Sequence, residues 1–231
     1  MSLIPKAMHK VNRKYVSPAA IRVVEKLRAA NFEGYIVGGA VRDLILGGKP
    51  KDFDVATNAT PEEIKSLFRS ARIIGRRFQI VHVRDGREII EVTTYRGPHV
   101  SEGPGKSASK QSDKGLLLRD NVYGTLAEDA ARRDLTINAM YYNPIDESVL
   151  DQMDGHQDIN ARLVRILGDP QTRYREDPVR MLRVVRFAAK LQFDIESETE
   201  SAISACGPLL AEIPPARLFD EFLKLFMAGY G

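Results

Sequence analysis

A pair of glycines followed closely by two aspartates limits the fold of this chain more than any other feature of its sequence. The segment GYIVGG, ending at Gly38 and Gly39, has the pattern of a short apolar strand with a glycine turn, and AVRDLILGG that of a helix. KDFDVAT then alternates as a strand does, so that Asp52 and Asp54 share one face while Phe53 faces the core. The chain must therefore run from a strand through a turn and a helix into a second strand.

The two aspartates indicate a metal site. Neighbouring carboxylates repel each other unless a proton or cation lies between them, and Mg²⁺ prefers such oxygen ligands. Paired metal ions serve phosphoryl and nucleotidyl transfer, and the amides of a glycine turn before a helix suit a triphosphate. Glu91, on a following strand, is a candidate third carboxylate. The alternatives are a solvated strand edge for the Asp-x-Asp and an ordinary surface glutamate for Glu91.

Other phosphate-binding motifs are absent from the sequence. Gly48 and Lys49 are followed by Pro50, so there is no G-x-x-x-x-G-K-[ST] motif, and no G-x-G-x-x-G motif occurs. Walker-type ATPases and Rossmann dehydrogenases are thereby excluded.

The order of helix and strand patterns predicts an α+β fold. Periodicity predicts a helix from Ser17 to Asn31, a capping box at Thr60 starts another, and Asp85-Gly86 predicts a hairpin between RFQIVHVR and REIIEVTTYR. GTLAEDAARRDLTINAMYY is predicted to be helical, and NPIDESVLDQMDG a turn with a strand. We expect a mixed, partly antiparallel sheet with flanking helices, then an all-helical part with proline stops at Pro170, Pro208 and Pro214–Pro215.

These patterns divide the chain into three parts. A basic N-terminal arm occupies residues 1–16, an α/β head residues 17–160, and a helical neck residues 161–231. Residues 97–115 have almost nothing to bury and are expected to form a mobile loop within the head. The strongly apolar last helix needs a further partner, so we expect the chain to be truncated after the neck.

Composition narrows the class of protein further. One cysteine, Cys206, cannot form an internal disulfide, and no apolar run is long enough for a membrane span, so we expect a cytoplasmic protein. The net charge of +3 hides local clusters: residues 1–30 carry seven Lys and Arg against one Glu, and residues 161–190 carry eight against three acids. Such basic segments suit a polyanion.

A row of arginines marks the predicted neck. Asp177 and Pro178 start a helix on which Arg180, Arg183 and Arg186 recur every three residues, opposite an apolar face of Met181, Val184, Val185 and Ala188. Arginine presents a planar fork of donors, so Asp177 with Arg180 could form a template for a nucleobase edge. The alternative is an ordinary solvated basic face.

Three segments resemble the motifs of one family. GGAVRDLILGGKPKDFDVATNATPEEI, ARRDLTINAMYYN and GDPQTRYREDPVRMLRVVRFAAKL are similar to successive motifs of the bacterial poly(A) polymerase and CCA-adding tRNA nucleotidyltransferase family (class II). The resemblance runs from about residue 20 to the C-terminus. Within the family, IIGRRFQIVHV and the loop leading into LLLRDNVYGTLAEDA are more similar to the poly(A) polymerases.

The resemblance implies a role for each matching residue. Asp52, Asp54 and Glu91 would bind Mg²⁺ and catalyse, with Asp134 among the essential acids. The glycine turn at Gly38 and Gly39, with Arg42, would contact the nucleotide phosphates, and Arg133 with Asp134 the incoming sugar. Asp177 and Arg180 would present a hydrogen-bonding edge to the base, and the row continuing through Arg183 and Arg186 would line the nucleotide and RNA path.

The function implied is template-independent addition of AMP from ATP to RNA 3′ ends. Two Mg²⁺ ions would assist attack of the 3′-hydroxyl on the α-phosphate. The expected partners are an RNA 3′ end and ATP, with the protein acting as a monomer. The close alternative is a CCA-adding enzyme, and a more distant one is a non-catalytic RNA-binding module.

Overall fold

The computed structural model describes residues 2–75, 79–97, 110–111, 117–119 and 122–227. Within this part of the chain, an eight-stranded sheet forms the centre of the head. In spatial order its strands are β1 (Ser2–Ile4), β10 (Ser148–Asp151), β9 (Met140–Asn143), β2 (Tyr35–Val37), β3 (Asp54–Thr57), β6 (Glu88–Thr94), β5 (Ile80–Asp85) and β4 (Ala71–Ile74). Only the β3–β6 pair is parallel among these neighbours, so the predicted mixed, largely antiparallel sheet is confirmed.

Local sequence signals explain most of the head. The predicted β5–β6 hairpin is present, but Asp85 belongs to β5 and the turn residues are Gly86 and Arg87, with Gly86 at a φ of 62° that favours glycine. Helix α1 (Pro18–Ala29) begins after Ser17, whose hydroxyl accepts hydrogen bonds from the first turn. Helix α3 (Pro61–Leu67) has the predicted Thr60–Glu63 capping box. The remaining head helices are α2 (Gly39–Ile45), α4 (Leu126–Ala131) and α5 (Gly155–Ala161).

The two faces of the sheet differ. Val55, Val81, Val83, Ile90 and Val92 form the core with α1 and α3 on one face. On the other face, α4 covers only the part near Val37, Ala56 and Tyr141. The cross-strand row that contains Asp54 and Glu91 lies on this second face, beside the covered part.

Three local predictions need correction. The helix predicted through AMYY ends at Ala131, and Met140–Asn143 is strand β9, because its buried tyrosines fill the space between β2 and β10. Strand β3 begins at Asp54, so Asp52 precedes it on a loop. Strand β4 was not predicted, and Ser2–Ile4 of the N-terminal arm forms the edge strand β1.

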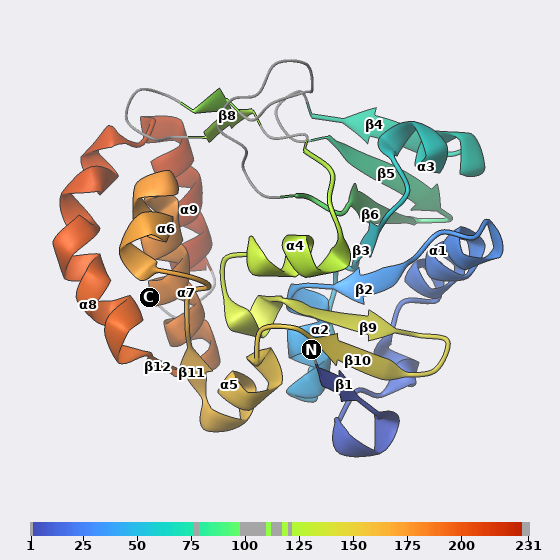
Figure 1. Cartoon of the computed structure of the whole chain (residues 1–231), viewed down its shortest axis with the longest axis horizontal. Coiled ribbons are helices and arrows are strands. Elements are labelled where there is room, and N and C mark those ends of the chain that lie inside the picture. Colours follow the sequence, from blue (N-terminus) through green and yellow to red (C-terminus); the bar gives the residue numbers. More distant parts are fainter. Residues whose placement is uncertain (1, 76–78, 98–109, 112–116, 120–121, 228–231) are drawn as a thin grey trace.

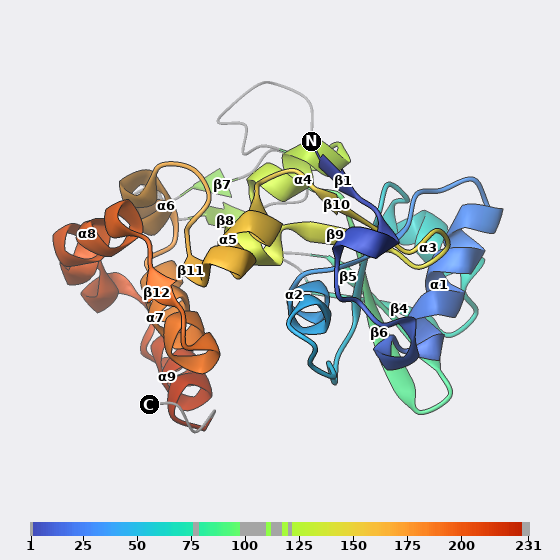
Figure 2. The same cartoon turned by 90° about the horizontal axis from the view of Figure 1, so that it is seen from below.

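The neck lies to one side of the head sheet (Figures 1 and 2). Its helices are α6 (Pro170–Glu176), α7 (Val179–Leu191), α8 (Ser197–Cys206) and α9 (Pro215–Met227), with a 3₁₀ turn at Gly207–Glu212. The short parallel strands β11 (Leu163–Val164) and β12 (Asp194–Ile195) join it to the head segment, an addition to the all-helical expectation. Pro170 and Pro215 begin helices rather than end them, because proline lacks the amide that a first turn leaves unpaired.

Two further expectations concern the rest of the chain. Most of the loop predicted at residues 97–115 lies outside the described residues. Within the described part, none of the helices has both the length and the apolar character needed to cross a bilayer.

Candidate active site

Two carboxylates meet where β3 and β6 run parallel. Asp54, the first residue of β3, is the direct cross-strand neighbour of Glu91 on β6. Phe53 and Val55 are buried, so Asp52 and Asp54 both stay on the solvent side as the alternation predicted. Asp54 as a residue is exposed, but protein atoms surround its carboxylate. This loss of solvent, together with the like charges of Glu91 and Asp52, raises the pKa of Asp54 to about 6, and the positive charge of Arg133 offsets only part of the increase. The site therefore concentrates negative charge at Asp54.

The carboxylates alone do not make a complete metal cage. In the described residues no group of three or more His, Cys, Asp or Glu side chains is arranged to hold a metal ion. Mg²⁺ is ordinarily bound through one or two carboxylates together with substrate phosphates, not by an all-protein cage. Asp52 and Asp54 beside Glu91 have the oxygen chemistry for such a shared site.

The glycine turn brings two opposite charges together. Gly38 has φ 73° and ψ −139°, a conformation that side-chain-bearing residues rarely adopt. A Cβ atom there would lie 3.7 Å from Nη1 of Arg133 and 4.0 Å from Oδ2 of Asp54. Gly39 begins α2, and a Cβ on it would crowd Nη2 of Arg42 at 3.3 Å. The backbone of the turn thus lies close to both Asp54 and Arg133.

Arg133 is held by a buried network that sequence inspection missed. Its Nη2 donates to Oδ2 of Asp129 at 2.9 Å, and its Nε to the hydroxyl of Tyr141 at 3.0 Å. The Tyr141 hydroxyl donates to the same Asp129 oxygen at 2.6 Å. Burial alone would lower the pKa of Arg133, but Tyr141 and Asp129 raise it, so the guanidinium stays charged. The i,i+4 spacing of Asp129 and Arg133 was the one sequence signal for this pair.

Arg42, which the resemblance implies as a phosphate contact, lies inside the protein. It is buried, with Nε on Oδ1 of Asp43 at 2.8 Å and Nη1 on Oδ1 of Asn138 at 2.6 Å. Its guanidinium also lies 4.7 Å from the ring centre of Phe187 in the neck. In this structure the guanidinium of Arg42 is directed into the protein, where it contacts both the head and the neck, and not toward solvent.

Asp134 joins the head to the neck. Its carboxylate lies 2.6 Å from Nη2 of Arg183 on α7 and accepts from the amide of Leu135. Burial would raise its pKa, but Arg183, the Leu135 amide and Asn138 hold the pKa below its usual value. Asp134 therefore stays ionised where the two parts of the molecule meet.

A second contact between head and neck comes from Arg173. The side chain is buried on α6, and its Nη2 donates at 2.6 Å to the carbonyl oxygens of both Arg132 and Arg133. Its Nη1 donates to Glu176 at 2.9 Å. Burial and the neighbouring Arg180 lower the pKa of Arg173 to about 10, which still leaves it charged at neutral pH. Arg173 thus anchors the backbone that carries Arg133.

The side chains of the two neck residues predicted to read a base each pair with another residue. Asp177 pairs with Arg217 of α9 at 2.7 Å, while Arg180 pairs with Glu176 at 2.8 Å. Arg186 lies 3.7 Å from Glu221.

The predicted row of solvated guanidiniums is also only partly present. The side chains of Arg180 and Arg186 are 12% and 16% exposed, against 40% for Arg183. On the opposite face Met181 and Val184 are buried as expected, but Val185 is exposed. The partner of Arg180 is Glu176, four residues earlier at the end of α6, and that of Arg186 is Glu221 on α9, so both partners lie outside the helix that carries the row.

The raised pKa of Asp54 predicts a pH-dependent stability in metal-free buffer. Between 3.8, the ordinary value, and about 6 the folded protein keeps a proton that the unfolded chain has lost. Proton binding to the folded state means that stability falls as pH rises through this window. The measurement is the melting temperature of the wild type and of Asp54→Asn in the presence of a chelator. A difference in melting temperature between the two proteins that stays constant from pH 3.8 to about 6 would contradict the raised pKa of Asp54.

Comparison with known proteins agrees with this geometry. Residues 34–165 match the family described as the Poly A polymerase head domain, and residues 192–231 match the probable RNA and SrmB-binding site of polymerase A. A protein of Salmonella typhimurium named Poly(A) polymerase I is 52% identical over all 231 residues, and a CCA-adding enzyme of Lactobacillus gasseri is 38% identical over 217. These alignments cover 100% and 94% of this chain.

A solved structure shows the same fold. The CCA-adding enzyme of Bacillus stearothermophilus in complex with CTP superposes with a TM-score of 0.76 and 33% identity, covering 91% of this chain and 49% of that one. The chain spans about half the length of the curated relatives it matches, 50% of the Salmonella protein and 52% of the Lactobacillus protein. Because the head-domain match covers more than half of its residues, the chain belongs to the poly(A) polymerase head domain family.

Proposed function

We propose that this chain is the catalytic part of a template-independent RNA nucleotidyltransferase that adds AMP from ATP to RNA 3′ ends. The observation that carries the proposal is the cross-strand pairing of Asp54 with Glu91 beside a glycine turn and a half-buried, charged Arg133. Carboxylates next to a phosphate-sized backbone turn and a fixed cation are what nucleotidyl transfer needs. In this proposal the head spans residues 17–160 and the neck residues 161–231.

The acidic residues fit a divalent cation. Asp52 and Asp54, with Glu91 adjacent, would hold Mg²⁺, and the raised pKa of Asp54 reflects the like charges that such a cation would relieve. When bound, two such ions would lower the pKa of the RNA 3′-hydroxyl and neutralise charge on the leaving pyrophosphate.

The other residues would position ATP. Arg133 is fixed by Asp129 and Tyr141 and would hold the nucleotide near Asp54, with Asp134 next to it in sequence. On the neck, Asp177 and Arg180 would present polar edges to the base once their present partners, Arg217 and Glu176, yield or share them. Their present pairing means that ATP binding requires local side-chain rearrangement in the neck.

Adenylate addition is preferred over CCA addition because of the relatives. The proteins named Poly(A) polymerase I from Salmonella typhimurium and Haemophilus influenzae are 52% and 54% identical across the whole chain, against 38% for CCA-adding enzymes. CCA addition remains the second candidate because the superposed Bacillus structure, which shares the head and neck, was solved with CTP.

A direct assay separates the two. ATP, CTP, GTP and UTP are offered singly, and CTP is also offered together with ATP, with Mg²⁺, to a generic single-stranded RNA primer and to tRNA lacking its 3′ end. We expect long tracts from ATP alone on either acceptor. Addition that needs CTP first and stops after C-C-A on tRNA would establish the alternative, and no addition from any nucleotide would contradict both.

A further inference from the structure

A row of polar side chains continues outward from Asp54 across the open face of the sheet. The register places Asp54 opposite Glu91, Glu91 opposite His82, and His82 opposite Arg72. Nε2 of His82 lies 3.4 Å from Oε1 of Glu91. Adjacent strands are about 4.8 Å apart, so Arg72 lies roughly 14 Å, or three strand spacings, from Asp54. The site described above therefore connects directly to β5 and to the edge strand β4.

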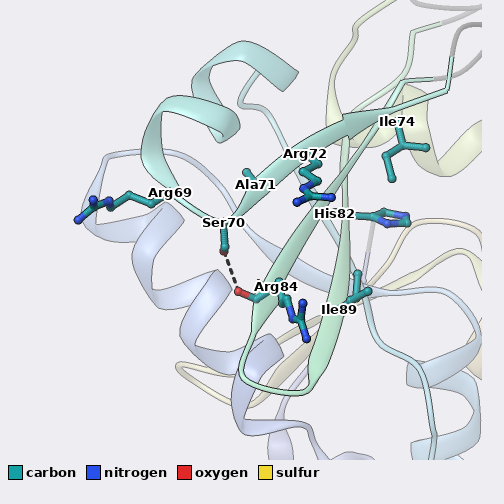
Figure 3. A pocket seen from close by; sticks show the side chains of 8 residues that line it. All are labelled: Arg69, Ser70, Ala71, Arg72, Ile74, His82, Arg84 and Ile89. Atoms are coloured by element: carbon teal, nitrogen blue, oxygen red, sulfur yellow. Dashed lines mark hydrogen bonds between the residues drawn. The ribbon is translucent and has the colours of Figure 1, made fainter.

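This end of the row opens into a hollow of about 360 Å³ on β4, β5 and β6 (Figure 3). It is lined by Arg69, Ser70, Ala71, Arg72, Ile74, His82, Arg84 and Ile89. Figure 3 shows Arg72 next to His82 and Arg84 next to Ile89, whereas Arg69 extends away from the others. The hollow thus combines two guanidiniums and an imidazole with two apolar side chains.

The charges of this surface are not neutralised by the protein. In the described part of the chain neither Arg72 nor Arg84 has a carboxylate partner, and Arg84 makes only a 3.3 Å hydrogen bond from Nε to the carbonyl of Gly86. The guanidiniums of Arg180, Arg183 and Arg186, by contrast, are paired with acids. Ile74 and Ile89 are 45% and 55% exposed, which is unusual for large apolar side chains beside charged groups. Unpaired cations alternating with apolar surface suit a strand of phosphates and bases.

The order of the β-strands indicates the side from which the RNA approaches Asp54. The groups assigned above to ATP, namely Gly38, Arg133 and the neck, lie on the β2 and β9 side of Asp54, while β6, β5 and β4 lie on the other side. In phosphoryl transfer the attacking and leaving oxygens are roughly in line on opposite sides of the phosphorus. An RNA whose 3′-hydroxyl attacks ATP must therefore approach Asp54 from the side of β6, β5 and β4.

We propose that Arg72 and Arg84, with Ile74 and Ile89, form a subsite for the single-stranded RNA segment just upstream of the reacting 3′ end. Arg72 and Arg84 bind backbone phosphates, and the two isoleucines contact base or sugar faces. At roughly 3.4 Å per stacked nucleotide, the 14 Å from Asp54 corresponds to about four nucleotides. The inference rests on the proposed function, because it takes RNA as the acceptor.

Binding of a 3′-deoxy oligoadenylate twelve nucleotides long, followed by fluorescence anisotropy over a salt series, tests the subsite. For the double variant R72Q/R84Q we expect affinity to fall about tenfold, and the slope of log K against log salt to decrease by roughly 1.4, since each lost phosphate contact contributes about 0.7 for a single strand. Arg69→Gln removes one positive charge from a side chain that extends away from the other lining side chains, so it is the charge-matched control for each of the single variants Arg72→Gln and Arg84→Gln and should bind as the wild type does. Unchanged affinity and slope in the double variant, or an equal loss in Arg69→Gln, would overturn the subsite.

Primer length gives a second, independent readout. With ATP saturating, the double variant should lose kcat/KM on a twelve-nucleotide primer, and the loss should shrink on a dinucleotide that does not reach Arg72. An equal loss on both primers would place the effect at the carboxylates and would overturn the subsite.

The two proposals fail in distinguishable ways. A wild type that adds no nucleotide, combined with weakened oligoadenylate binding in the double variant, contradicts the proposed function and supports the subsite. A wild type that adds AMP, combined with a double variant that binds and extends RNA normally, supports the proposed function and contradicts the subsite.

Discussion

Asp54→Asn is expected to reduce nucleotide addition by at least about 10³-fold, equivalent to about 4 kcal/mol of transition-state stabilisation. The substitution keeps the shape of the side chain but removes a charged metal ligand at the point where β3 meets β6. It also removes repulsion with Glu91, so the fold should persist and the metal-free protein should melt no lower than the wild type at neutral pH. Steady-state incorporation of labelled AMP measures the activity.

The control for this variant is Asp194→Asn, the same substitution at an exposed residue of β12. It should retain wild-type activity. A second measurement is the rise in melting temperature on adding Mg²⁺ with ATP, which should be present in the wild type and in Asp194→Asn but small in Asp54→Asn. Asp54→Asn that extends RNA at near the wild-type rate would refute the assignment of the metal site to this carboxylate.

Asp129→Ala is expected to destabilise the protein by about 3–5 kcal/mol, because it leaves a buried guanidinium without its carboxylate. Asp129 is 6% exposed and accepts hydrogen bonds from both Arg133 and Tyr141. With this partner removed, Arg133 no longer keeps its place beside Gly38 and Asp54, so KM for ATP should rise as well. Urea unfolding measures the first effect and steady-state kinetics the second.

A double-mutant cycle with Arg133→Met separates the pair from its surroundings. Removing both members of a buried ion pair costs less than the sum of the single losses, so the double variant should be more stable than additivity predicts. Glu128→Gln, one residue away on the exposed side of α4, is the control and should cost at most about the 1 kcal/mol of its capping contact. A loss below about 1 kcal/mol in Asp129→Ala would show that Arg133 is held by other contacts.

Local signals predicted the part of the head that carries the carboxylates. The capping box at Thr60, the hairpin at Gly86 and the alternation around Phe53 each depend on neighbouring residues alone, and all three occur as predicted. The wrong helix prediction for the segment that forms β9 arose because its conformation depends on distant parts of the chain. Met140–Asn143 has no strand alternation because it is buried on both faces, and only its position between β2 and β10 gives it strand geometry.

The sequence alone determined the family and the α+β class, and it predicted the acids Asp52, Asp54 and Glu91, because the motifs that carry them are short and contiguous. The tertiary structure decided which arginine side chains are paired with protein groups and which are free to bind a ligand. It buried Arg42 against Asn138 and Phe187, paired Arg180 and Arg186 with Glu176 and Glu221, and left Arg72 and Arg84 without acids. Pairing between side chains of different elements depends on how the elements pack in space, and no local pattern in a single sequence records it.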